Sequence, residues 1–450
     1  MNRIAQHYIR SVSTANVVAA MSGSSHSEPS PDEGVGTIRR WNAAQTDRLN
    51  QAHWAKAHGN EINQDIFEDI RALRARASFE RANNPLLEGV VNTHADDIVG
   101  ENGPLLQVQS DDQRYNDRLE EACAEVFADI DVNGQMALPD VMRLFVSQLW
   151  DKGEYVAREV TGGQVDSLVS FRLLAVNADR LDSDPRSTGD PLVALGVRRS
   201  SQGRPVSYQV NEPTPMGAYV LDGTRYEEFS ADEVIHVYKL LEPGQVRGVP
   251  WTSSVLQCIA DLRDFDVQTL DAARQAADYA VLLTNKHDDA PYLPINDSTT
   301  IQRRTISTAP PGWDVNQLAP AHPGPQYVPF RRERLRELGR PVSMPLMKIL
   351  LGCEDHNFSS ARMDNQNYAR SLGCIQKSLF VRPLLNRIVR RVERELMLVR
   401  RKGQFVLPRR PEKVNYQWTF AKQPHVDPKK ERDAEAIGLL ETRTLPCAAA

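Results

Sequence analysis

The spacing of apolar residues changes twice along this chain, and the change limits the folds that the sequence can adopt. From Ile62 to Trp150 apolar side chains recur every three or four residues, which predicts a series of α-helices. Between about Glu154 and Tyr238 short alternating runs are separated by Gly-containing turns, which predicts an antiparallel sheet built from hairpins. Helical spacing returns after Ser253. The predicted fold class is therefore α+β.

The first helical region contains a predicted break and a predicted stop. Asn83-Asn84-Pro85 is expected to end the helix that starts at Ile62, because the residue before a proline avoids the helical conformation. The next helix is expected to stop at Gly100. Two more helices are predicted before residue 150.

The region after the sheet is predicted to contain two long helical segments separated by prolines. The first runs from about Ser253 to Asn285. Residues 287–326 contain seven prolines, so no long helix is expected there. The basic segment FRRERLRELGR (330–340) follows. Helical spacing then resumes from Ser359 to about Lys402, and Pro383 is expected to kink or divide that helix.

Composition narrows the class of protein. The formal net charge is −5 and the pI about 6.1, so the chain lacks the global basic bias of many nucleic-acid binders. The net charge does not exclude nucleic acid as a partner. Five scattered cysteines without a C-x-x-C predict neither a disulfide framework nor a zinc site. No stretch approaches the roughly 18 apolar residues of a membrane span, so we expect a soluble protein. We also expect neither a cofactor nor a metal.

The segment DIDVNGQMALPD (129–140) resembles a calcium-binding loop in its spacing. The residues at loop positions one, three, five and six are Asp129, Asp131, Asn133 and Gly134. Position twelve is Asp140, where the bidentate glutamate of such loops is expected. The alternative, which we favour, is a turn stabilised by Asp131 and Asn133 before the next helix begins.

The segment DHNFSSARMDNQNYAR (355–370) brings together residue types that hydrolases use. Asp355, His356, Ser359 and Ser360 lie within six positions. A serine nucleophile needs a strained turn and an oxyanion hole, and no G-x-S-x-G or equivalent is present. We therefore predict no catalytic residue here. Ser359 or Ser360 is instead expected to cap the helix that follows.

Five segments, in this order, resemble the portal proteins of lambda-like tailed bacteriophages. They are RALRARASFERANNPLLEGVVNTHADDIVGENG (71–103), WDKGEYVAREV (150–160), EVIHVYKLLEPGQVRGVPWTSSVL (233–256), NFSSAR (357–362) and HVDPKKE (425–431). The motif residues for which the resemblance implies structural roles are Asn83, Asn84, Pro85, Gly100, Gly153, Glu154, Arg247, Gly248 and Pro250. The chain departs from the family at 340–343, where Arg-Pro-Val-Ser replaces Gly-Val-Pro.

The resemblance implies a structural protein that is not an enzyme. Portal subunits form a homo-oligomeric ring, usually of twelve, at one vertex of the capsid. Double-stranded DNA passes through the ring during packaging and ejection, without sequence specificity. The implied partners are the terminase large subunit, which hydrolyses ATP, the major capsid protein, the scaffold and the neck proteins. The implied location is the virion, and the host cytoplasm during assembly.

The resemblance also divides the chain into parts of a portal fold. These are a disordered tail (1–36), a wing with a helical and a β-rich part (37–250), a descending stem helix (251–286), a Pro-rich clip (287–326), a returning stem helix (327–348), a tunnel loop (349–358), a tunnel and wing helix (359–402) and a wing return with a short crown (403–450).

Within these parts the residues predicted to meet DNA lie around the tunnel loop. They are Glu354, Asp355, His356 and Asn357, with Lys348 also in the channel. An acidic or neutral rim repels phosphates, and the ring multiplies a weak effect. Arg362 is expected to anchor the helix to an acidic partner. The alternatives are a calcium-binding or hydrolytic enzyme using 129–140 or 355–360, or a different head–tail connector, which would be a much shorter chain.

Overall fold

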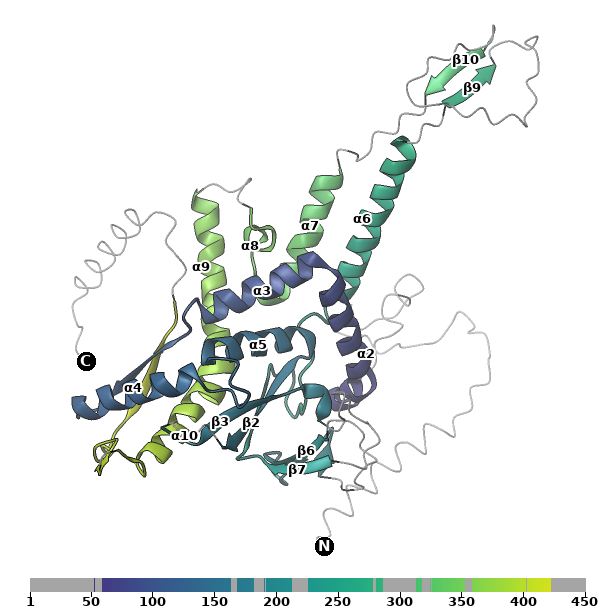
Figure 1. Ribbon diagram of the computed structural model, residues 1–450. Coiled ribbons are helices and arrows are strands. Elements are labelled where there is room, and N and C mark those ends of the chain that lie inside the picture. Colours follow the sequence, from purple (N-terminus) through teal and green to yellow (C-terminus); the bar gives the residue numbers. More distant parts are fainter. Residues whose placement is uncertain are drawn as a thin grey trace, which may run out of the picture. The chain divides into compact units, whose positions relative to one another are not determined.

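The computed structural model describes residues 59–162, 168–181, 192–212, 226–277, 281–285, 313–317, 326–352, 358–401 and 403–421, with the single residues 52, 190 and 324. The chain divides into two units, Met1–Gly59 and Asn60–Ala450, and every helix and strand named below belongs to the second (Figure 1). The tail predicted to be disordered, residues 1–36, lies outside the described residues.

Asn84 separates the first two described helices. α2 spans Ile62–Asn83 and α3 spans Pro85–Val99. The Asn84 side chain accepts hydrogen bonds from two backbone N–H groups in the first turn of α3, at 3.1 and 3.4 Å. Pro85 occupies the first helical position, where its missing N–H costs nothing. α3 ends at Gly100, whose φ is 79°. The break and the stop predicted from the sequence are confirmed.

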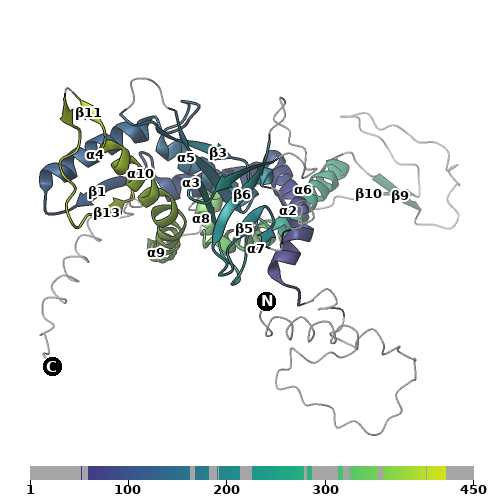
Figure 2. The same cartoon turned by 90° about the horizontal axis from the view of Figure 1, so that it is seen from below.

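Two more helices complete this helical part. α4 spans Gln113–Ala128 and α5 spans Leu138–Asp151. The Asp112 side chain caps α4 by accepting from the backbone N–H of Tyr115 at 3.1 Å. α5 buries most of one face and packs on α3 and on strand β2 (Glu154–Thr161). In Figures 1 and 2, α4 lies on the left of the four helices α2 to α5 and α2 lies on their right.

The β-rich part is antiparallel, as predicted. β2 lies in the centre of a three-stranded sheet with the order β3-β2-β8. A four-stranded sheet has the order β4-β5-β6-β7, and β1 pairs with β13 near the end of the described chain. The bounds are β1 Leu105–Gln109, β3 Phe171–Val176, β4 Val193–Ala194, β5 Val197–Arg199, β6 Pro205–Asn211, β7 Tyr226–Ser230, β8 Val234–Tyr238 and β13 Asn415–Thr419, with a short 3-10 helix η2 at Ala178–Arg180.

Two antiparallel helices extend beside each other from the body of the unit (Figure 1). α6 spans Leu256–Ala277 and α7 spans Tyr327–Gly339. The Phe265 ring lies between those of Tyr327 and Phe330, with centroid distances of 5.7 and 4.9 Å. We call this pair of helices the α6–α7 hairpin.

The helix predicted to continue to Asn285 is shorter than expected. α6 ends at Ala277, and β9 (Val281–Asn285) pairs antiparallel with β10 (Trp313–Gln317). The local pattern favoured a helix, but β9 has a strand partner about 30 residues further along, which local spacing does not reveal. Most of the Pro-rich segment between these strands lies outside the described residues.

The last long helix is continuous through Pro383 but changes its winding there. After a 3-10 turn η3 (Arg340–Val342) and a short helix α8 (Leu346–Leu350), the chain forms α9 (Phe358–Ile375), a π-helical segment η4 (Gln376–Leu385) and α10 (Asn386–Leu396). In an α-helix the proline ring clashes with the carbonyl four residues earlier, and the wider π turn relieves that clash.

The prediction that this helix reaches Lys402 was wrong by one and a half turns. α10 ends at Leu396, and β11 (Arg400–Arg401) pairs with β12 (Gln404–Phe405) in a small hairpin. Gly403 in its turn has φ 83°, a conformation that favours glycine.

The π segment is anchored in the core. The Tyr155 ring of β2 stacks on Phe145 of α5, with centroids 4.3 Å apart, and on Phe380 of η4 at 5.7 Å. The Tyr155 hydroxyl donates to the Leu379 carbonyl at 2.5 Å. A carbonyl in η4 is thereby satisfied by a side chain from the sheet.

Replacement of Asn84 by alanine is expected to weaken the junction of α2 and α3. The two N–H groups at the start of α3 would lose their acceptor, which costs about 1 kcal/mol of folding free energy. Urea denaturation followed by circular dichroism measures the change, with Asn92→Ala on the exposed side of α3 as the control. Equal stability of the Asn84 variant and the wild type would contradict the capping role.

Candidate functional site

The residues predicted to meet DNA are described only in part. Glu354, Asp355, His356 and Asn357 lie outside the described residues. Lys348 belongs to α8, and its Nζ lies 3.0 Å from Oδ1 of Asp97 on α3. The ammonium group of Lys348 is therefore engaged within its own subunit.

The helix-capping residues sit slightly later in the helix than predicted. α9 begins at Phe358, so Ser359 and Ser360 lie inside its first turn and not at the position before it. Ser360 is exposed, and the Ser359 side chain is outside the described part of the structure. Arg362, two residues after Ser360 in α9, is half-buried.

The carboxylate of Asp97 lies next to residues on both sides of the segment predicted to be the tunnel loop. Asp97 contacts Lys348 of α8, before the loop, and its negative charge acts on the Tyr368 hydroxyl of α9, after it. Burial and this negative neighbour raise the pKa of the Tyr368 hydroxyl, so the phenol stays protonated as a donor. The Gln376 side chain donates to the Ile98 carbonyl at 2.8 Å and adds a second link between α3 and this region.

A fully buried carboxylate, Glu154, lies where β2 begins, and both of its oxygens are hydrogen-bonded. Oε1 accepts from Arg74 Nη2 at 2.7 Å and from Arg247 Nε at 2.8 Å. Oε2 accepts from the Gly248 N–H at 2.7 Å and lies 2.9 Å from His236 Nε2. This single side chain joins α2, β2, β8 and the segment that leads into α6.

The arginines keep Glu154 ionised. Burial alone raises the pKa of a carboxyl, but attraction to Arg247 and Arg74 outweighs it and holds the pKa of Glu154 well below its ordinary value. Arg74 also pairs with Asp179 at 3.0 Å. Arg247 donates to the carbonyls of Leu195 and Ala178, both at 2.9 Å. The buried charges are thus matched by partners.

Two glycines let the backbones cross beside this carboxylate. A Cβ on Gly153, whose φ is 82°, would lie 2.2 Å from the carbonyl carbon of Val249. A Cβ on Gly248 would lie 2.2 Å from the Gly153 carbonyl oxygen. Neither position has room for a side chain. Gly153, Glu154, Arg247, Gly248 and Pro250, which two separate motifs contributed, therefore meet at one point.

Sequence patterns did not identify Arg74 or His236 as members of this network. Arg74 lies on the same face as Ile66 and Ile70, at four-residue spacing, and is only 4% exposed. A charged residue in an apolar stripe indicates a buried partner, and this signal was available from the sequence. The sequence around His236 gives no comparable signal, because a polar residue at this position fits the ordinary alternation of polar and apolar residues in a strand.

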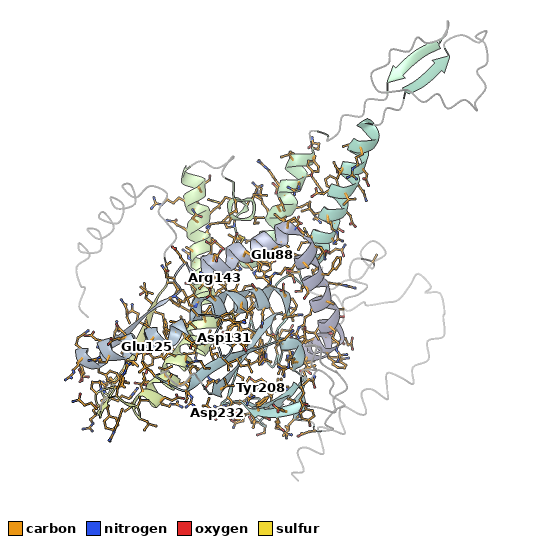
Figure 3. The ribbon with its side chains drawn as sticks, in the orientation of Figure 1. Glu88, Glu125, Asp131, Arg143, Tyr208 and Asp232 are labelled. Atoms are coloured by element: carbon orange, nitrogen blue, oxygen red, sulfur yellow. The ribbon has the colours of Figure 1, made fainter. Side chains whose placement is uncertain are left out.

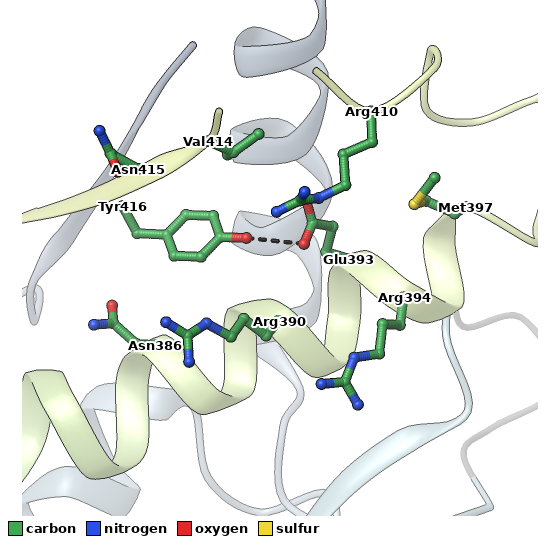
Figure 4. Close-up of a pocket in the computed structure, with 9 residues that line it drawn as sticks. All are labelled: Asn386, Arg390, Glu393, Arg394, Met397, Arg410, Val414, Asn415 and Tyr416. Atoms are coloured by element: carbon green, nitrogen blue, oxygen red, sulfur yellow. Dashed lines mark hydrogen bonds and ion pairs between the residues drawn. The ribbon is translucent and has the colours of Figure 1, made fainter. Parts of the chain in front are cut away.

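A second buried carboxylate, Glu393 of α10, connects α10 to β13 and α4 (Figure 4). It accepts hydrogen bonds from Tyr416 Oη at 2.8 Å, from Arg410 Nε at 2.9 Å and from the Tyr115 hydroxyl. Burial and Glu393 raise the pKa of Tyr416 to about 12. The hollow beside it has a volume of about 610 Å³, and Arg390 and Arg394 also line it.

The acidic residues of the calcium-like segment have separate partners. Asp129 pairs with Arg172 at 3.1 Å, and Asp140 with Arg143, also at 3.1 Å. Asp131 is buried between α4 and α5, where its carbonyl accepts from the Gly134 N–H at 3.0 Å (Figure 3). Within the described ranges, no three His, Cys, Asp or Glu side chains are grouped as metal ligands. The geometry at 129–140 is that of a stabilised turn.

Comparison with known proteins shows the family. The family model described as phage portal protein, lambda family, matches residues 48–376. The chain belongs to the lambda family of phage portal proteins. Among the described helices, none combines the length and apolar character needed to cross a bilayer.

Solved structures with a similar fold include necks of gene transfer agent (GTA) particles. The neck of an empty particle, with C6 symmetry, is 15% identical, covers 86% of this chain and 92% of its own, and has a TM-score of 0.48. The neck of a native particle, with C12 symmetry, is 14% identical at 81% and 89% coverage, with a TM-score of 0.47. An HK97 family portal protein from Corynebacterium diphtheriae is 12% identical at 80% and 98% coverage, with a TM-score of 0.35.

Replacement of Glu154 by glutamine is expected to destabilise the subunit strongly. The change keeps the shape of the side chain but leaves Arg247 buried without its counter-charge and Arg74 with Asp179 alone, which costs about 3–5 kcal/mol. Urea denaturation at pH 7 measures the loss, and Glu125→Gln on the exposed side of α4 (Figure 3) is the control.

The loss should depend on pH in one direction. Because folding lowers the pKa of Glu154 below its ordinary 4.5, its contribution is complete above pH 4.5 and disappears as the pH falls through the folded-state value. The difference between wild type and variant should therefore stay constant from pH 7 to about 5 and shrink at lower pH. A difference that grows in acid would contradict the network.

Proposed function

We propose that this portal protein assembles into a closed ring of twelve at one vertex of the capsid, and that double-stranded DNA passes through its centre. The observation that carries the proposal is the family match over residues 48–376, which includes helices α2 to α9, both main sheets and the α6–α7 hairpin. In this role the subunit performs no bond chemistry. Its task is to close a symmetric channel.

The parts of the subunit are proposed to have the roles that the family resemblance implies. Helices α2–α5 and the sheets would form the wing, and the α6–α7 hairpin would form the stem. Residues 287–326 would form the clip, which docks the terminase large subunit and later the neck proteins. The wing would contact the major capsid protein and the scaffold. The ring would form in the host cytoplasm and remain in the virion.

Glu354, Asp355, His356 and Asn357 are proposed to face DNA in the tunnel loop. Asp97 supports this role indirectly, because it fixes α8 and α9 on the two sides of these residues. Its contact with Lys348 changes the role that we propose for that lysine. Lys348 would position the base of the loop and would not itself face DNA.

Purified wild-type protein is expected to form closed rings. When each subunit binds the next one through two different surfaces, the subunits close into a ring if the rotation between neighbours is a whole fraction of a full turn. Native mass spectrometry and negative-stain electron microscopy measure the subunit number and the central opening. A protein that stays monomeric at every concentration and ionic strength would refute the ring.

Reversal of charge in the loop should impair DNA passage without affecting assembly. In Glu354→Arg/Asp355→Arg rings, twelve copies would place about 24 positive charges at the channel wall, and phosphate binding would become strongly salt-dependent. The measurements are ring formation and the fraction of DNA-filled heads in a packaging assay. A normal filled fraction with intact rings would remove the loop from the DNA path. Glu125→Arg is the control for a charge change outside the channel.

A further inference from the structure

A hollow with a volume of about 1100 Å³ is lined by the continuous helix η4–α10 and by strands β6 and β8. Two carboxylates, those of Glu159 and Asp232, belong to its lining. Six arginines also line it, from the turn before β6, from η4 and from α10. They are Arg204, Arg382, Arg387, Arg390, Arg391 and Arg394. We call this site the arginine hollow.

Two of these arginines hold the subunit together. Arg387 donates from Nη1 to the Val234 carbonyl at 2.9 Å, and its Nε contacts the Glu159 carboxylate. Arg391 lies 3.0 Å from the carboxylate of Glu395 and 3.8 Å from that of Glu159. These contacts join α10 to β2 and β8, and they neutralise Glu159.

The other four arginines are exposed and unpaired. Within the described ranges, none of their side chains forms an ion pair or a hydrogen bond. Because Arg387 and Arg391 match Glu159, the carboxylate of Asp232 stands alone against these four charges. Four arginines less one aspartate leave the lining with an excess of three positive charges. The unpaired residues are Arg204, Arg382, Arg390 and Arg394.

The helix itself does not account for this excess. The negative end of a helix dipole favours cations in the last turn, which explains Arg394 but neither Arg382, before α10 begins, nor Arg204, from another part of the chain. Glu393 of α10 is not the missing counter-charge, because it is buried and bound by Arg410 and Tyr416. Figure 4 shows the side chains of Arg390 and Arg394 apart from it.

We propose that the arginine hollow binds an acidic segment of a partner protein, whose carboxylates pair with Arg382, Arg390 and Arg394. A guanidinium group binds a carboxylate through two parallel hydrogen bonds, and every cation that the hollow presents is an arginine. Sites for small molecules have volumes of roughly 300–1,000 Å³, so a hollow of about 1100 Å³ has room for a segment of chain.

An acidic protein segment fits this lining better than double-stranded DNA does. Val206 is 48% exposed and lies in the lining with Pro205 and Pro383. Burial of this apolar surface stabilises a contact with apolar side chains, which phosphates lack. The carboxylate of Asp232 would repel phosphates, whereas a protein segment can offer it an N–H group. The chain as a whole also has a net charge of −5, without the general basic bias of many nucleic-acid binders.

Binding of a defined acidic peptide to the full-length protein tests the proposal. The probe is a fluorescein-labelled peptide of about twelve glutamates in which every fourth residue is replaced by leucine, and fluorescence anisotropy measures its dissociation constant. Arg390→Glu/Arg394→Glu is expected to raise this constant about tenfold or more, because like charges then face each other. Arg390→Gln/Arg394→Gln removes the charge without repulsion and should give a smaller increase.

The matched control is Arg114→Glu/Arg118→Glu on α4. These two arginines are also exposed and four residues apart, so the variant makes the same change in charge outside the hollow. It is expected to bind the peptide as the wild type does. Circular dichroism checks that each variant is folded.

Two further measurements locate the peptide and test its charge. Hydrogen exchange of the amides in 203–206 and 230–232, at the hollow, should slow when the peptide binds, while exchange in β1 should not change. A peptide with lysine in place of glutamate should bind Arg390→Glu/Arg394→Glu more tightly than it binds the wild type.

Three outcomes would overturn the proposal. The first is an acidic peptide that does not bind, and the second is one that binds Arg390→Glu/Arg394→Glu as well as it binds the α4 control. The third is a labelled DNA duplex that binds more tightly than the peptide and is lost only in Arg390→Glu/Arg394→Glu, which would assign the hollow to DNA. A wild-type protein without rings would refute the proposed assembly alone, because the arginine hollow is complete within one subunit.

Discussion

The buried carboxylate of Glu154 determines how α2 and the three-stranded sheet are connected to the α6–α7 hairpin. From the start of β2, its oxygens fix Arg74 of α2, His236 of β8 and the Arg247-Gly248 segment that leads into α6. α6 begins within ten residues of this segment. Between them, the Thr252 hydroxyl donates a hydrogen bond to the Trp150 carbonyl at 3.1 Å. Since Gly153 and Gly248 touch backbone to backbone, the point from which α6 starts has little freedom. The direction of the α6–α7 hairpin depends on this crossing.

Asp97 and Glu393 are two further carboxylates that connect separate parts of the chain. Each is an acid with little exposure that joins segments far apart in the chain: Asp97 joins α3 to α8, and Glu393 joins α10 to α4 and β13. A buried ion pair adds little net stability over well-packed apolar residues. Its directional hydrogen bonds do fix one arrangement. We infer that geometry is what these acids contribute, because small errors in a subunit's orientation accumulate around a ring.

Local sequence patterns predicted the elements better than their ends or their partners. Helical spacing and the Asn84-Pro85 junction predicted α2 and α3, since caps and breaks are local. The end of α6 was missed because Val281–Asn285 is a strand only through its pairing with β10. Glu154 and Arg247 were singled out by resemblance, but 93 residues separate them, and no periodicity shows that they touch. The contact between Lys348 and Asp97 could not be predicted from local spacing either, because 251 residues separate them.

The charge division of the hairpin and the needs of a channel lead to the same arrangement. α6 has two more aspartates than arginines, and α7 has two more arginines than glutamates, so their excess charges are equal and opposite. Both excesses are neutralised inside the hairpin, where Asp261 and Asp266 of α6 pair with Arg334 and Arg331 of α7. A ring of such stems then presents little net charge of either sign to DNA. Charge balance within each subunit thus gives a channel wall with weak attraction for the phosphates that pass along it.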